Sequence, residues 1–184
     1  MPKVSQEHVE ARRTQILDGA RRAFAKDGYD GATVARLEEE TGLSRGAIFH
    51  YFADKLDLFV ALAADTNRRY GNLMIERGLD AALREMAKEN PEWIAVLIEL
   101  QSRLRHDEDF EARLMAAHAP ESSRIAEWFE ARQADGAFRS DVSSNELGRF
   151  ATMVINGMAI RIASGDPFDV EATLKLLNDA IAPR

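Results

Sequence analysis

The stretch from residue 41 to residue 51 carries side chains whose types and spacing suit contact with a nucleic acid. The sequence predicts a helix that ends at Thr41, a turn at Gly42 and a second short helix capped by Ser44. Two short helices joined by a glycine turn form the pattern of a helix-turn-helix. The first turn of the second helix then enters the major groove, so its side chains must be small or polar. The pattern predicts DNA binding, although it is also common in helical proteins that bind no DNA.

The residues expected to read bases are Ser44, Arg45, Gly46 and Ala47. A glycine lets the backbone come close to the DNA. A guanidinium such as that of Arg45 can donate two hydrogen bonds to the O6 and N7 atoms of guanine, or it can hold a phosphate. The alternative for Arg45 is a solvated surface charge, and a serine is also an ordinary helix cap.

Four flanking residues are expected to contact phosphate oxygens, either from ring donors or at the start of a helix. These candidates are Thr33, His50, Tyr51 and Lys55. A threonine in this position is also an ordinary helix cap, and Tyr51 also fits a plain core aromatic. The spacing alone does not decide between these interpretations.

The charge distribution divides the chain in two. The net charge of the 184 residues is −7, yet residues 1–55 hold nine basic and nine acidic side chains. All of the net negative charge therefore belongs to the rest of the chain. Because local potential decides whether a surface approaches phosphate, the balance does not exclude DNA binding. The asymmetry hints at two functional halves, and we expect a DNA-binding domain over residues 1–53 and a second domain over residues 54–184.

Hydrophobic periodicity predicts an all-α protein of about nine helices, the first three forming the helix-turn-helix region. The expected helices cover residues 7–26, 34–41, 45–51, 55–76, 80–89, 91–104, 107–136, 145–163 and 170–182. Pro120 is expected to break or restart the seventh of them.

Several classes of protein find no support. The chain has no cysteine, which excludes disulfides, thiolate zinc sites and a cysteine nucleophile. No apolar run is long enough to cross a membrane, and the first residues lack a secretory signal, so we expect a cytoplasmic protein. Zinc-protease and phosphate-loop motifs are absent, so we expect no enzyme. An all-helical enzyme with an unrecognised acid–base pair and a protein-interaction module remain as alternatives.

Two further sites are expected in the second domain. The helices over 145–163 and 170–182 carry small and apolar side chains suited to a two-fold helical interface, although ordinary buried helices would look the same. The candidate interface residues are Leu147, Ala151, Ile155, Met158, Leu174, Leu177 and Ile181. The candidate effector-binding residues are Trp93, Arg103, Phe110, His118, Arg124, Trp128 and Asn156. Each of the aromatic residues among them is equally suited to a core position.

Three segments together resemble the N-terminal signature of the TetR family of transcriptional regulators: Gly28–Val34, Thr41–Phe52 and Asp54–Phe59. The resemblance covers about a third of the chain. It implies a homodimeric repressor that binds a palindromic DNA operator and responds to a small-molecule effector, with residues 54–184 as its effector-binding and dimerisation domain. It also implies that residues 44–47 read the major groove, while Thr33, His50, Tyr51 and Lys55 hold phosphates.

Within that family, residues 1–5, 16–22 and 36–39 resemble the actinobacterial repressors of aconitase expression. This narrower resemblance implies a role in the citrate cycle. It also implies a small carboxylate effector, such as a tricarboxylate, with a divalent metal. No cofactor is otherwise required, and no metal ligands are assigned.

Overall fold

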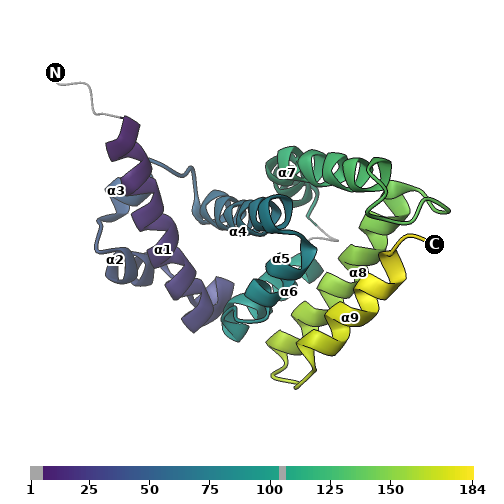
Figure 1. The fold of residues 1–184 in the computed structure, drawn as a ribbon. Coiled ribbons are helices and arrows are strands. Elements are labelled where there is room, and N and C mark those ends of the chain that lie inside the picture. The colour runs from purple at the N-terminus through teal and green to yellow at the C-terminus, as the bar shows by residue number, and fades with distance from the viewer. Residues whose placement is uncertain (1–5, 104–106) are drawn as a thin grey trace.

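A computed structural model of the chain describes residues 6–103 and 107–184, without the side chains of residues 101–103. All regular structure in these ranges is helical (Figure 1). The helices are α1 (Gln6–Gly31), α2 (Val34–Thr41), α3 (Arg45–Ile48), α4 (Lys55–Arg77), α5 (Leu79–Met86), α6 (Pro91–Arg103), α7 (Glu108–Ala134), α8 (Ser144–Ala163) and α9 (Val170–Ile181). The all-α prediction is confirmed.

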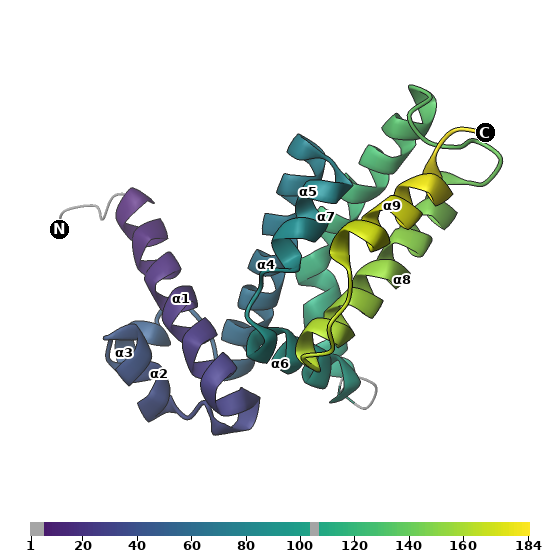
Figure 2. The same cartoon turned by 60° about the horizontal axis from the view of Figure 1, so that its bottom comes forward.

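The helices form two groups that share α4. Helices α1 to α3 lie together at the N-terminal side, and α4 leads from them into the group made by α5 to α9 (Figures 1 and 2). Helix α1 packs against α2, α4 and α6, while α4 packs against α5 and α7. Helices α8 and α9 lie at the far side from α1 to α3. A change in the position of α4 or α6 therefore reaches α1 directly.

The first hydrophobic core holds the N-terminal helices in place. Helix α1 buries Ile16, Ala20 and Phe24 at helical spacing. At Gly19 the two backbones come so close that an added Cβ atom would lie 2.7 Å from the Cα atom of Thr41 in α2. The same core continues across the expected boundary at residue 53 to include Trp93 of α6. The two groups are thus joined by continuous packing.

The second core lies among the C-terminal half of α4 and helices α5 to α9. It includes Met74, Leu83, Phe129, Leu147 and Leu174. Within one helix the buried residues repeat at helical spacing, as Leu174, Leu177 and Ile181 do on α9, which explains why periodicity located the helices.

Four helices differ from expectation, among them α5, which ends at Met86, three residues before its expected end. Helix α1 kinks at Gly28, where φ is 70°, and adds one more turn to Gly31. Helix α3 ends at Ile48, three residues early. Helix α7 continues through Pro120. A proline removes one backbone hydrogen bond, but α7 packs along both α4 and α8, and these contacts hold its two halves in line.

Candidate nucleic-acid interface and effector cavity

Local hydrogen bonds stabilise the turn of the helix-turn-helix. The Thr41 hydroxyl donates to the Leu37 carbonyl oxygen at 2.7 Å and accepts from the backbone N–H of Leu43 at 3.2 Å. Gly42 adopts the left-handed conformation (φ 69°) that ends α2. The Ser44 hydroxyl then accepts from the Ala47 N–H and caps α3. The turn is therefore set by residues that are local in sequence.

The first turn of α3 is open to solvent. Ser44, Arg45 and Gly46 are exposed, Ala47 is half-buried, and Ile48 points into the core. A Cβ atom added at Gly46 would meet no other atom within 4 Å. The structure thus brings the four candidate base-reading residues together on a surface that no other part of the described chain covers.

The flanking candidates lie around this turn and differ in exposure and in their contacts within the chain. Thr33 and His50 are exposed, and Tyr51 is half-buried with its ring edge-on to His50. The ammonium of Lys55 donates to the Tyr29 carbonyl oxygen at 2.9 Å and lies 4.5 Å from the Tyr29 ring centre. Burial lowers the pKa of Lys55. Among the described hydrogen bonds, Lys55 has one donor engaged within its own chain, which leaves two for another partner.

Sequence reasoning did not identify a role for Glu38. Its carboxylate accepts the backbone N–H of Arg45 at 2.6 Å and so connects α2 to the first residue of α3. It satisfies a donor that a helix start leaves without an intrahelical partner. An acidic residue seven positions before Arg45, on the exposed side of the first helix of the motif, is the only sequence signal for this contact.

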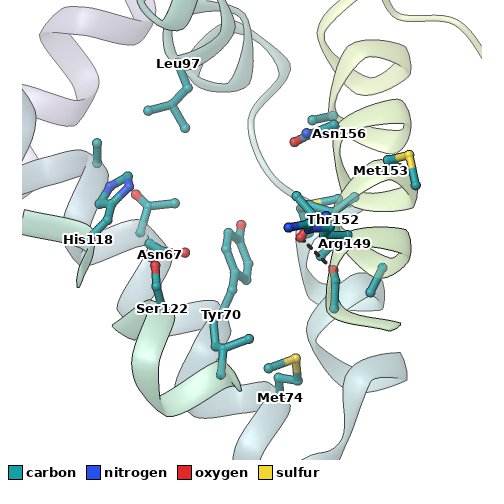
Figure 3. Close-up of a pocket in the computed structure, with 18 of the residues that line it drawn as sticks. Asn67, Tyr70, Met74, Leu97, His118, Ser122, Arg149, Thr152, Met153 and Asn156 are labelled. Carbon is teal, nitrogen blue, oxygen red and sulfur yellow. Dashed lines mark hydrogen bonds between the residues drawn. The ribbon is translucent and has the colours of Figure 1, made fainter. Parts of the chain in front are cut away.

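A cavity of about 1280 Å³ opens between α4, α6, α7 and α8. Its wall is mainly apolar, and polar side chains project from three of the helices (Figure 3). The polar residues labelled there include Asn67 and Tyr70 of α4, His118 and Ser122 of α7, and Arg149, Thr152 and Asn156 of α8. A mainly apolar cavity with a few polar groups is the usual form of a small-molecule site.

The expected effector residues are not all found at this cavity. Phe110, His118 and Asn156 line it. Trp93 is fully buried in the first core, beneath the guanidinium of Arg21. Trp128 packs edge-on to the ring of Phe129 instead of lining the cavity.

The two expected arginines do not contribute described contacts at the cavity. Arg124 is exposed and donates to Glu121 and Asn72 at 2.7 and 2.8 Å. The side chain of Arg103 lies outside the described residues. Sequence reasoning missed Tyr70 and Arg149, because helical spacing did not show which neighbouring helix each would face.

The ionisable groups at the cavity set limits on its ligand. The Nε2 atom of His118 is buried without a hydrogen-bond partner, and burial lowers the pKa of this imidazole. Arg149 supplies a cation but pairs with Glu146 at 3.2 Å. Among the residues that the structure describes, no three His, Asp or Glu side chains form a group able to hold a metal ion.

The expected interface residues of α8 and α9 mostly face the core of their own subunit. Six of the seven are buried and Ile155 is half-buried; the buried ones are Leu147, Ala151, Met158, Leu174, Leu177 and Ile181. Met153, Ile160 and Leu176 are exposed instead, each more than half accessible, and Met153 and Ile160 are also among the residues that line the cavity. Periodicity located the apolar helices but could not show which apolar stripe faced inward.

Within the described ranges, no helix is both long and apolar enough to span a membrane.

We call the exposed first turn of α3, residues 44–47, the reading turn. A reading turn on two helices linked by a glycine, joined to a helical body with a cavity, defines a helix-turn-helix DNA-binding protein. Residues 16–62 match the family of bacterial regulatory proteins named tetR. The chain is 41% identical to the HTH-type transcriptional repressor Rv1474c of Mycobacterium tuberculosis, over 98% of each chain. It is 39% identical to the HTH-type transcriptional repressor AcnR of Corynebacterium diphtheriae, over 98% of this chain and 97% of the relative. The chain belongs to the TetR family.

Solved structures agree in fold. Salmonella enterica GusR superimposes with a TM-score of 0.70 at 19% identity, over 98% of this chain and 99% of that chain. A TetR transcription regulator from Haloarcula marismortui superimposes with a TM-score of 0.68 at 23% identity, over 93% of this chain and 95% of that chain. The predicted family is confirmed, and it places the chain among transcriptional regulators, not enzymes. Of the segments that carried the narrower resemblance, residues 1–5 lie outside the described residues.

Proposed function

We propose that this chain is a homodimeric transcriptional repressor that binds a palindromic duplex and is controlled by a small molecule in the cavity between α4, α6, α7 and α8. The observation that carries the proposal is the open first turn of α3, where a Cβ atom added at Gly46 would meet no other atom within 4 Å. A single reading helix buries little surface, so two copies on one duplex are needed for specific binding. Such a repressor acts in the bacterial cytoplasm, where the chromosome is.

The proposal is tested first on the reading turn. We expect Arg45→Ala to relax the preference between bases by about 1–3 kcal/mol, because a bidentate arginine–guanine contact is lost. We expect Lys55→Ala to weaken binding to all duplexes alike and to reduce its salt dependence, because a phosphate contact carries no sequence information. The measurement is fluorescence anisotropy with a duplex selected by the wild-type protein from a randomised pool, at several salt concentrations.

Arg132→Ala is the control, because Arg132 lies near the end of α7, away from α3 and from the helices proposed below to form the dimer, and pairs with Asp135. If both reading-turn variants bind every duplex as the wild type does, the assignment of this surface is wrong.

The dimer is proposed to form through α8 and α9. The residues expected from the sequence shape the inner side of this helix pair, and Leu176 of α9, which does not line the cavity, supplies exposed apolar surface. We expect Leu176→Glu to raise the dimer dissociation constant at least about tenfold, because a carboxylate would be buried without a partner.

Analytical ultracentrifugation measures the dissociation constant. Met115→Glu is the matched control, since Met115 of α7 is equally exposed but lies on another helix. An unchanged dimer in the Leu176 variant, or an equal loss in both variants, would rule out this interface.

The proposed effector is a small carboxylate such as citrate, bound with a divalent metal, and the proposed target is aconitase expression. Support comes from the sequence resemblance to aconitase repressors and from relatives named AcnR. Arg149 offers a cation at the cavity wall, and a guanidinium suits a carboxylate. Most ligands of the metal would have to come from the bound carboxylate or from water, because no three His, Asp or Glu side chains among the described residues form a metal-binding group.

Thermal unfolding tests the effector. At a concentration of citrate and Mg²⁺ about 100-fold above the dissociation constant, we expect the midpoint to rise by about 5 °C or more. Arg149→Ala should abolish the rise, whereas Arg161→Ala, a matched exposed arginine on the same helix paired with Asp166, should keep it. No rise in the wild-type protein with citrate, with or without Mg²⁺, would exclude this ligand.

A further inference from the structure

A cluster of polar side chains joins the wall of the cavity to the DNA-binding helices. Tyr70 of α4 lines the cavity (Figure 3). Its hydroxyl donates to the Oε2 atom of Glu89 at 2.7 Å. Glu89 lies in the connection between α5 and α6, and the same oxygen stands 3.5 Å from the Nη1 atom of Arg21 in α1. The chain of contacts therefore runs from the cavity to α1 through a single carboxylate.

The arginine of this cluster is held on three sides. Its Nη2 atom donates to the Thr66 hydroxyl of α4 at 3.0 Å, and its guanidinium lies over the ring of Trp93 at 5.1 Å from the centroid. The side chains of Arg21 and Glu89 are only 21% and 11% exposed. A charge pair so shielded from water interacts more strongly than one on the surface, so the pair constrains α1 more than an exposed bridge would.

The electrostatics agree with a carboxylate held between donors. Burial alone would raise the pKa of Glu89, but the Tyr70 hydrogen bond and the positive charges of Arg69 and Arg21 outweigh it and lower that pKa. Burial and the Glu89 carboxylate both raise the pKa of Tyr70 far above its ordinary value. Tyr70 therefore remains protonated and acts as a donor, while Glu89 remains charged.

Helix α1 transmits its position to the reading turn. Gly19 of α1 sits against Thr41 at the end of α2 with no space for a methyl group. The side-chain amide of Gln15 also donates to the Thr41 carbonyl oxygen at 2.9 Å. Since Thr41 and Glu38 in turn hold the start of α3, a tilt of α1 moves the reading turn with it.

We propose that Tyr70, Glu89 and Arg21 form the connection through which the cavity controls the reading turn. This inference rests on the proposed function, since it assigns a regulatory role to the wall of the same cavity. A ligand with an acceptor oxygen takes the Tyr70 hydroxyl from Glu89. Arg21 meets Glu89 as a charge pair without a hydrogen bond from its Nη1 atom. Glu89, which is still paired with Arg69, can then move away from Arg21, and α1 loses one constraint on its orientation. Only the fraction of dimers whose two reading turns match the half-site spacing binds the duplex, so the apparent affinity falls.

A second contact between the two groups of helices does not serve this role. Arg113 of α7 donates to Asp54, the cap of α4, at 3.3 Å. Neither of these residues lines the cavity, so no ligand there competes for their hydrogen bond. The connection through Tyr70 is distinguished by having one member in the cavity wall and another on α1.

The test measures orientation and DNA binding separately. The chain has no cysteine, so Ala35→Cys on α2 and Glu127→Cys on α7 allow one pair of spin labels per chain. Double electron–electron resonance measures the distance between the two labels. The labelled protein is mixed with an excess of unlabelled protein, so that most dimers carry labels on one chain only and the measured distance lies within that chain. In this background we compare Tyr70→Phe, which removes only the hydroxyl, with Glu89→Gln, which removes the charge.

Glu171→Gln is the matched control. Glu171 pairs with Arg84 through two hydrogen bonds of 2.7 and 2.8 Å, but this pair joins α5 to α9 and does not reach α1. We expect the distance distribution to shift or broaden in Tyr70→Phe and in Glu89→Gln, and to stay unchanged in Glu171→Gln. An unchanged distribution in the first two variants overturns the proposal.

Binding to the selected duplex gives the second measurement. We expect Tyr70→Phe and Glu89→Gln each to weaken binding about 3- to 10-fold, the effect of losing one hydrogen bond. The double variant should bind like Glu89→Gln alone, because both changes act on one contact. Additive losses, or unchanged or tighter binding, overturn the proposal. If no duplex is selected at all, the proposed function fails, while the distance measurement still decides whether the connection exists.

Discussion

Gly46→Leu is expected to abolish specific DNA binding, with a loss of at least about 100-fold in affinity, while the protein folds as before. An added side chain meets no atom of the protein within 4 Å of its Cβ, and Gly46 is not among the glycines with positive φ. The free protein therefore accommodates leucine without strain. In the complex, the same side chain would occupy the space between the first turn of α3 and the base edges.

Anisotropy with the selected duplex measures this loss, and thermal unfolding shows whether the fold is intact. Gly46→Ala should give a smaller loss, because a methyl group separates the backbone from the DNA less. Ala116→Leu, on the exposed surface of α7, controls for added apolar surface. Full affinity of the Gly46→Leu variant would show that the reading turn does not enter a groove.

Trp93→Ala is expected to lower the free energy of unfolding by about 3–5 kcal/mol, the usual cost of truncating a large buried aromatic side chain. Trp93 is completely buried, contacts the ring of Phe59 at 5.9 Å between centroids, and supports the guanidinium of Arg21. Its loss leaves a void at the place where α1, α4 and α6 meet. We therefore expect DNA binding to weaken as well.

Urea unfolding followed by circular dichroism measures the change. Met115→Ala is the control, and it should alter stability by no more than about 0.5 kcal/mol because that side chain is 65% exposed. The interpretation of Trp93 as an effector contact makes the opposite prediction: stability would be unchanged and only the ligand response would be lost.

The proposed connection between the cavity and α1 depends on residues that are far apart in the sequence. Its central residue, Glu89, lies 68 positions after Arg21 and 19 after Tyr70 in the chain, so no local pattern relates the three. Its side chain also accepts the backbone N–H of Asn90 at 3.2 Å, where α6 is about to begin. The residue that links the two groups of helices is therefore also held by the helix start beside it.

The sequence alone determined the helix-turn-helix and most helix boundaries. The reason is that these features depend on interactions between close neighbours. Gly42 ends α2 because its own backbone adopts a positive φ, and Ser44 begins α3 by capping an N–H three residues away. For the same reason the candidate base-reading residues could be named from spacing alone, and the structure places them together on an open surface.

Only the tertiary structure decided which side of each later helix faces inward and which polar groups meet. Apolar residues occur around most of α8, so periodicity could not tell the buried Met158 from the exposed Met153. Trp93 and Arg124 looked suited to a ligand site, yet packing placed them in the core and on the outer surface. The contacts of Glu38 and Glu89, and the position of Arg149 at the cavity, depend on how separate helices cross. That geometry is set by the packing of whole helix faces.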